Sequence, residues 1–321
     1  MARTILLLHG RNYKPPQDEL TELWSTVIRH GLLRDRPDAV AAFDAADLTL
    51  AYYADLSADW LATHHLQRRE PVPAYDVGAD LADRRASVER LMTLDAADFS
   101  RNFYARMRGA APIFEAVADA LEHPLRLLRL SERALQRYAP ELAEYWADVH
   151  FGSDLRLRFQ GYLQKAMAGT SNEIAVISHS LGTLIAYDAA WKLSHYGEYR
   201  RQRWNRPIDL FVTLGGPLGD STINRRLKGA TAPEPFRYPT NIRRWHNFAA
   251  EDDIIAHDED LTNDFAAMAT DLTDHHVYNP SIRRGRVNPH YAPGYLMNPA
   301  LIDLLADWLI ADPELRPAGG V

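Results

Sequence analysis

The stretch IAVISHSLGTLIAYD (Ile174–Asp188) restricts the possible folds more than any other part of the sequence. Its apolar run stops at Ser178, and a helical pattern begins directly after Gly182. A strand that turns straight into a helix holds the residue at the bend in a strained conformation with its side chain exposed, so the residues two before and two after must be small. Ser178 and Gly182 meet this requirement around Ser180.

A small residue two positions before a serine and a glycine two positions after it are typical of a nucleophile elbow at such a junction. Ser178 stands where glycine is usual and adds a β-carbon at a crowded place. The bend sets the Ser180 hydroxyl at a helix N-terminus, where the dipole favours developing negative charge. The alternative interpretation is a serine-rich turn that only caps the helix.

Further apolar runs bounded by turn residues predict strands, and helical patterns lie between most of them. The predicted strands are Thr4–Leu8, Asp47–Tyr53, Glu173–Ser178, Ile208–Leu214 and Asn241–Ala249. The predicted helices beside them are Gln17–Leu33, Gly182–Ser194 and Ala300–Ile310. Most of these strands are apolar throughout, which favours central parallel strands covered on both faces, and the alternation predicts an open α/β sheet.

Residues 57–168 interrupt the alternation, because this interval contains helical patterns and no convincing strand. The patterns are Asp80–Met92, Pro112–Leu121, Leu125–Tyr138 and Pro140 through Met167. We therefore expect a core built from residues 1–56 and 169–321 with a helical insertion at 57–168. The insertion is either a set of helices against the sheet edge or a cap over the site, and its last helix is expected to pack on the sheet.

Composition excludes several functional classes. The 321 residues carry a formal net charge of −7, whereas nucleic-acid binding calls for a basic surface. No apolar run approaches the roughly 20 residues that span a bilayer, and the N-terminus lacks the roughly 7–15 apolar residues of a signal peptide. The absence of cysteine excludes disulfides and thiolate metal sites and fits a cytoplasmic location.

The basic, leucine-rich segment 125–137 is interpreted as a core-facing helix with a charged outer face in preference to a membrane-surface helix.

HSLGTLIAYD resembles the elbow of lipase-like and esterase-like α/β-hydrolases. The resemblance covers Thr4–Asp55 and Glu173–Leu309 and leaves out most of the helical interval. It implies a mostly parallel sheet flanked by helices and a Ser-His-Asp triad. In this fold the acid and then the histidine follow the nucleophile in the chain.

The acid is expected in the loop after the strand Asn241–Ala249, where Asp252 and Asp253 precede two isoleucines. The usual spacing in the family favours Asp252, and an alignment with the acid directly before the aliphatic pair selects Asp253. Asp220, in the loop Thr213–Ser221, is a lower-ranked rival.

The base is expected in the loop before the last helix, which contains His290. His275 and His276 are the main alternative and are otherwise interpreted as loop or surface residues. Two further histidines are less favoured as the base. His257 lies too close to the acid loop to reach back to the serine, and His246 is interpreted as a packed strand residue. Neither His275–His276 nor His64–His65 has a spaced carboxylate partner, so no metal site is predicted.

The resemblance also implies an oxyanion hole made by the backbone N–H groups of Leu181 and Arg11. Gly10 lets the loop after the first strand point N–H groups into the site, and His9 is expected to hold that loop. The predicted substrate contacts are Gly10, Asn12, His179 and Gly216, with Arg11 and Lys14 available to a polar or anionic substrate or simply exposed to solvent.

Together these features predict a serine hydrolase of small-molecule carboxylic esters that uses Ser180, His290 and Asp252 and needs no cofactor. A thioesterase, peptidase or acyltransferase would use the same groups. The competing class is a non-catalytic ligand-binding or regulatory protein on a hydrolase scaffold.

Overall fold

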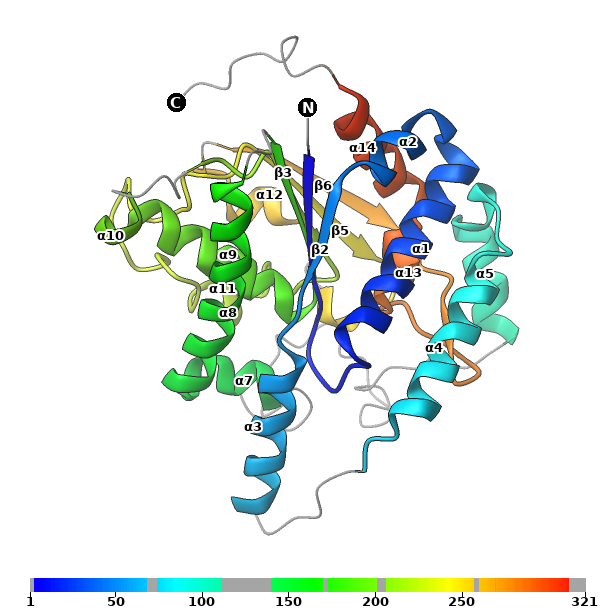
Figure 1. The fold of residues 1–321 in the computed structure, drawn as a ribbon, viewed down its shortest axis with the longest axis horizontal. Coiled ribbons are helices and arrows are strands. Elements are labelled where there is room, and N and C mark those ends of the chain that lie inside the picture. Colours follow the sequence, from blue (N-terminus) through cyan, green and yellow to red (C-terminus); the bar gives the residue numbers. More distant parts are fainter. Residues whose placement is uncertain are drawn as a thin grey trace.

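A computed structural model describes residues 3–67, 74–110, 140–169, 173–200, 206–256, 260–268 and 270–311. Its centre is a six-stranded sheet in the order β2-β1-β3-β4-β5-β6, in which every neighbouring pair is parallel (Figure 1). The strands are Arg3–Leu8 (β1), Asp47–Ala51 (β2), Glu173–His179 (β3), Leu210–Leu214 (β4), Arg244–Ala250 (β5) and Asp271–Val277 (β6). The predicted α/β class with a mostly parallel sheet flanked by helices is confirmed.

The longer helices cover both faces of the sheet, and Figure 1 shows them as two layers on either side of the strands. They are Gln17–Asp35 (α1), Ala54–Gln67 (α3), Val77–Leu91 (α4), Arg101–Ala110 (α5), Pro140–Ala147 (α7), Val149–Ala168 (α8), Leu181–His195 (α9) and Pro299–Ile310 (α14). The short helices are Val40–Asp44 (α2), Gly197–Arg200 (α10), Ser221–Asn224 (α11), Leu261–Asp264 (α12) and Ala292–Leu296 (α13). Single 3-10 turns occupy Pro37–Ala39, Ala96–Asp98 and Ile254–Ala256.

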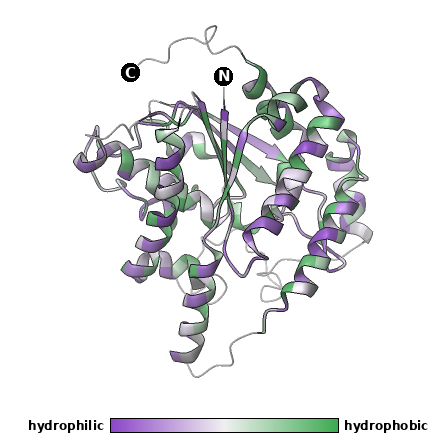
Figure 2. Ribbon diagram, viewed as in Figure 1, coloured by the Kyte–Doolittle hydropathy of each residue, from purple (hydrophilic) through white to green (hydrophobic). Residues whose placement is uncertain are grey.

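Each face of the sheet has its own hydrophobic core. Helices α1, α4, α13 and α14 pack on one face with Ile5 and Leu7 of β1, and α3, α7, α8 and α9 pack on the other with Leu6 and Leu8. Successive side chains of a strand point to opposite faces, so one apolar strand contributes to both cores. Figure 2 shows hydrophobic and hydrophilic residues alternating along the flanking helices, as expected for helices with one buried face.

The sixth strand was not predicted from the sequence. Strand β6, DLTDHHV, lies at the sheet edge and pairs only with β5 among the described strands. Its side chains are mostly half-exposed and polar, so its sequence lacks the apolar run of a central strand. The interpretation of His275 and His276 as loop or surface residues is corrected in part: both belong to this strand, so the loop assignment is wrong, and His276 is exposed at the surface.

The helical interval contributes to the layers that flank the sheet. Its last predicted helix is two helices, α7 and α8, because the Asp148 side chain accepts hydrogen bonds from the N–H groups of His150 and Phe151 and so starts a new helix. Leu155 and Phe159 of α8 are fully buried in the same core as β1 and β3. The predicted helices Pro112–Leu121 and Leu125–Tyr138 lie outside the described residues.

Candidate active site

Ser180 lies at the bend between β3 and α9. Its backbone has φ 57° and ψ −127°, a left-handed conformation that costs a non-glycine residue about 1–3 kcal/mol. A β-carbon on Gly182 would lie 2.6 Å from the carbonyl oxygen of His9, so only glycine allows the start of α9 to lie this close to the chain that follows β1. Ser178 is accommodated with its hydroxyl donating to the Val212 carbonyl at 3.0 Å. The strand–helix junction therefore has the strained backbone and the close packing that the sequence predicted. The predicted exposure of the side chain is wrong, because Ser180 is buried and only 3% exposed.

A chain of hydrogen bonds leads from this bend to a histidine and a carboxylate. His290 Nε2 lies 2.9 Å from Ser180 Oγ. His290 Nδ1 lies 3.0 and 2.9 Å from the two carboxylate oxygens of Asp253. An imidazole that donates Nδ1–H to a carboxylate leaves Nε2 free to accept a proton from the hydroxyl.

The carboxylate beside His290 is Asp253, so the preference for Asp252 is corrected. Asp252 has φ 66°, and this left-handed conformation turns its side chain to a different neighbour. Its carboxylate forms an ion pair of 2.9 Å with Arg108 on α5. Asp253 is completely buried at the side chain, as expected for an acid that orients a base.

Tyr295, on α13, holds Asp253 in place and was not identified from the sequence. Its hydroxyl donates to Asp253 Oδ2 at 2.6 Å and accepts from the Ala250 N–H at 2.9 Å. Burial, followed by the Asp253 charge, raises the pKa of Tyr295 well above its usual value, so the phenol stays protonated and remains a donor. The N–H of Ile255 donates to the other oxygen, Oδ1, at 3.0 Å.

His179 supports the backbone of His290. Its Nε2 lies 2.8 Å from the carbonyl oxygen of His290 and is the donor in this hydrogen bond. Burial, followed by the proximity of His290, lowers the pKa of His179 well below the usual value, so its ring is neutral. The ring is buried and contacts the loop of the base; its predicted contact with substrate stays a prediction.

The loop after β1 approaches the serine as the oxyanion prediction requires. A β-carbon on Gly10 would lie 2.7 Å from the Ser180 β-carbon and 3.2 Å from its hydroxyl oxygen. Of the next residues, Arg11 is half-exposed and Asn12 is exposed. The amine of Lys14 donates a hydrogen bond to the backbone carbonyl group of each. Leu181 is the first residue of α9, and the first N–H groups of a helix have no acceptor within the helix.

His9 anchors this loop, in agreement with its expected structural role. Its Nδ1 donates to the Gly10 carbonyl at 2.7 Å, and its Nε2 accepts from the Tyr53 N–H at 3.1 Å. The ring stacks on that of Tyr53 at 4.1 Å between centroids. Burial, assisted by the charge of Lys14, lowers the pKa of His9 to about 3.

Acid should therefore destabilise the protein through His9. In the unfolded chain the imidazole binds a proton near pH 6.5, whereas in the folded protein it stays neutral to about pH 3. The free energy of unfolding is expected to fall by about 1.4 kcal/mol for each pH unit below about 6 from this residue alone. Urea unfolding between pH 7 and 4.5 measures the slope. His9→Gln should have a shallower slope than wild type, and an equal slope would contradict the prediction.

Backbone strain concentrates at the carboxyl edge of the sheet. Among the described non-glycine residues, positive φ angles occur at Asn12 after β1, Ser180 after β3 and Asp252 after β5, and at Arg284 away from this edge. Three glycines also have positive φ, and one of them, Gly215, directly follows β4. Ligands of open α/β sheets bind at this edge, and strained residues cluster at functional sites. The same edge therefore carries the hydroxyl, its base and the residues around them.

The other candidates lie apart from the Ser180 hydroxyl or serve other contacts. His275 stacks on Phe248 with centroids 4.3 Å apart and lies 3.0 Å from His246, which is a strand residue as predicted. Asp220 caps α11 through two backbone N–H groups. Gly216 packs against Thr183, where a β-carbon would lie 2.5 Å from the hydroxyl oxygen.

The remaining paired histidines form no metal site within the described segments. His276 pairs with Asp260 at 3.0 Å on the surface, and the His64 ring stacks on Trp60. The side chain of His65 and all of His257 lie outside the described residues. Across the described residues there is no group of three or more histidine and acidic side chains arranged to hold a metal ion, and no helix is long and apolar enough to cross a membrane.

Comparison of the chain with protein-family models gives no match, and comparison with curated proteins gives no significant match.

Proposed function

We propose that this protein is a serine hydrolase that cleaves carboxylic esters through an acyl-enzyme. The observation that carries the proposal is the continuous hydrogen-bond chain from Ser180 Oγ through His290 to Asp253, at a strained strand–helix bend. A serine hydroxyl becomes a nucleophile when a base takes its proton and an anion orients that base. All of these groups are within hydrogen-bonding distance here.

In the proposed acylation, the Ser180 oxygen attacks the ester carbonyl carbon while His290 Nε2 takes the hydroxyl proton. The tetrahedral intermediate carries its negative charge on the former carbonyl oxygen, which the N–H groups of Leu181 and Arg11 are proposed to stabilise. The bond from carbon to the alkoxy oxygen then breaks, and His290 gives its proton to the leaving alcohol. The product is a Ser180 ester of the acyl group.

In the proposed deacylation, water attacks the acyl carbon and gives a proton to His290 Nε2. The bond to Ser180 Oγ breaks, this oxygen recovers the proton, and the carboxylic acid leaves. Asp253 keeps the imidazole in one orientation and stabilises its charged form in both halves of the reaction. Thioesters, amides and acyl transfer to another acceptor would use the same groups, so esters are proposed as the first substrates to test.

Purified protein is expected to hydrolyse p-nitrophenyl esters and to react with a fluorophosphonate. In the second reaction the Ser180 oxygen displaces fluoride from phosphorus and His290 accepts the proton. A chain-length series of esters measures kcat/KM, and peptide mass mapping locates the adduct. Modification of Ser180 together with turnover supports the proposal. A protein that is inert toward the whole series and stays unmodified contradicts it, and ligand-induced thermal stabilisation without turnover would favour the binding-protein alternative.

A further inference from the structure

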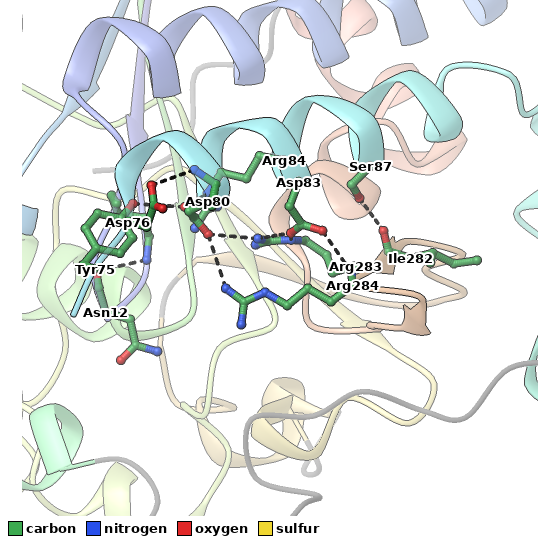
Figure 3. A network of polar contacts seen from close by, with 12 residues as sticks. Asn12, Tyr75, Asp76, Asp80, Asp83, Arg84, Ser87, Ile282, Arg283 and Arg284 are labelled. Atoms are coloured by element: carbon green, nitrogen blue, oxygen red, sulfur yellow. Dashed lines mark hydrogen bonds and ion pairs between the residues drawn. The ribbon is translucent and has the colours of Figure 1, made fainter. Parts of the chain in front are cut away.

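One face of helix α4, in the helical interval, is joined to the hairpin that precedes His290 in the chain (Figure 3). The hairpin consists of β7 (Ile282–Arg283) and β8 (Arg286–Val287). The α4 residues that contact the hairpin are Asp80, Asp83 and Ser87, and Arg84 binds Asp80 on the same helix. Their spacing of three and four residues places them on the same side of the helix.

Arg283 is the centre of the contact. Its Nη2 lies 3.0 Å from Asp80 Oδ1, and its Nε lies 2.7 Å from Asp83 Oδ2. The Arg283 side chain is only 10% exposed, so these charge-assisted hydrogen bonds are shielded from solvent. The hairpin backbone is held as well, because Asp83 accepts from the Arg284 N–H at 3.0 Å and the Ser87 hydroxyl donates to the Ile282 carbonyl at 2.6 Å.

Asp80 is kept ionised for this role. Burial alone would raise its pKa, but the guanidinium groups of Arg84 and Arg283 outweigh burial and lower the pKa below its usual value. Arg84 Nε lies 2.6 Å from Asp80 Oδ2, which also accepts from the Tyr75 hydroxyl at 3.0 Å.

The contact continues from Arg283 to the residue after the base. The Arg283 guanidinium lies 4.9 Å from the ring centroid of Tyr291, within cation–π range. The side-chain amide of Asn279 donates to the carbonyl groups of Pro289 and Tyr291, at 2.7 and 2.9 Å. Tyr291 therefore contacts the arginine that α4 holds, and both neighbours of His290 are fixed to Asn279, three residues before the hairpin.

Apolar packing between the same elements is incomplete. A pocket of about 200 Å³, partly open to solvent, lies between α4, α5 and the hairpin, and its lining includes Leu91, Phe103, Met107 and Ile282. The apolar side chains of these elements therefore do not fill the space between them.

We propose that Arg283 is a positioning residue that, through Asp80 and Asp83 of α4, fixes the loop carrying His290 at hydrogen-bonding distance from Ser180. The interval containing α4 then serves the reaction by holding the base in place. Helix α5 makes a parallel contact to the acid loop through the Arg108–Asp252 ion pair. This inference rests on the proposed function, since it assigns a role to residues behind the same site.

The test compares Arg283→Met with Arg85→Met. Arg85 is on the same helix, but it is 52% exposed and pairs with Glu19 of α1 at 2.7 Å. A misplacement of about 1 Å at a catalytic group can lower a rate by about 10²-fold. We therefore expect Arg283→Met to lower kcat by about 10- to 100-fold with little change in KM, and Arg85→Met to leave both within about twofold.

Two further variants keep the test decisive if Arg283→Met folds poorly. Asp83→Asn removes one charge at a half-buried side chain and should lower kcat by about three- to tenfold, and Arg283→Lys should recover part of the loss because it restores the charge without the planar fork. Thermal unfolding confirms that each variant is folded at the assay temperature.

The proton that His290 Nδ1 shares with Asp253 provides a spectroscopic signature besides activity. Its downfield resonance, assigned by its absence in Asp253→Asn, should broaden or disappear in Arg283→Met and persist in Arg85→Met. Folded Arg283→Met protein that keeps both the resonance and the wild-type kcat would overturn the inference. Failure of the proposed function can be distinguished from failure of the positioning role. In that case the wild-type protein would lack turnover, while the resonance would still broaden or disappear in Arg283→Met.

Discussion

Replacing Ser180 with alanine is expected to lower kcat for ester hydrolysis by a factor of about 10⁶ and to abolish fluorophosphonate labelling. The variant keeps the base, its orienting carboxylate and the backbone donors, but it has no oxygen to attack the carbonyl carbon. A residual rate about 10³–10⁴ above the uncatalysed reaction can persist, because oxyanion stabilisation and binding do not need the hydroxyl. Labelling stoichiometry by intact mass and kcat on the best ester are the measurements.

Ser178→Ala is the matched control. Ser178 is as deeply buried, lies two residues earlier on β3, and donates to the Val212 carbonyl instead of contacting His290. Removing its hydroxyl removes one hydrogen bond and should lower the free energy of unfolding by about 0.5–1.5 kcal/mol. The kcat of this variant should stay within about threefold of wild type. Equal loss of activity in the two variants, or full labelling of Ser180→Ala, would refute the assignment of the nucleophile.

The central strands and the bend at Ser180 could be predicted because the information lies in adjacent residues. A buried strand needs a short apolar run, and a strand that turns directly into a helix needs a small residue such as Gly182 beside the bend. In this structure glycine is required at position 182 because the start of α9 lies against the His9 carbonyl, in the chain after β1.

Strand β6 could not be predicted in the same way, because it lies at an edge. Its residues satisfy their backbone groups against β5 on one side and remain half-exposed, so no apolar pattern marks them. For this reason the sequence predicts loop or surface residues at His275 and His276, although pairing with β5 places both in the sheet.

The choice between two neighbouring carboxylates depends on contacts far away in the sequence. The Tyr295 hydroxyl and the His290 ring meet Asp253, whereas Arg108 meets Asp252. A left-handed backbone at Asp252 turns the two side chains to these different partners, and no local sequence pattern predicts that conformation. The Arg283–Asp83 contact is equally invisible in the sequence, since 200 residues separate its members.

These contacts predict that Asp253→Asn and Asp252→Asn have very different effects. In Asp253→Asn, one carboxylate oxygen becomes an NH₂ group. If this group replaces Oδ2 it faces the Tyr295 hydroxyl, and if it replaces Oδ1 it faces the Ile255 N–H, so a donor meets a donor in either orientation. An NH₂ group turned toward His290 favours the tautomer with the proton on Nε2, which cannot accept the Ser180 proton. The expected loss in kcat is about 10⁴-fold.

Asp252→Asn keeps the side-chain shape and removes the charge of a carboxylate that is 8% exposed and pairs with Arg108, which is 45% exposed. Because an ion pair with a solvent-exposed guanidinium contributes little, kcat should fall by less than about tenfold. Burst kinetics on a p-nitrophenyl ester separate the acylation step from deacylation for both variants, and thermal unfolding shows whether each is folded at the assay temperature. A larger loss for Asp252→Asn than for folded Asp253→Asn would mean that the carboxylate hydrogen-bonded to His290 is not the one that orients it during the reaction.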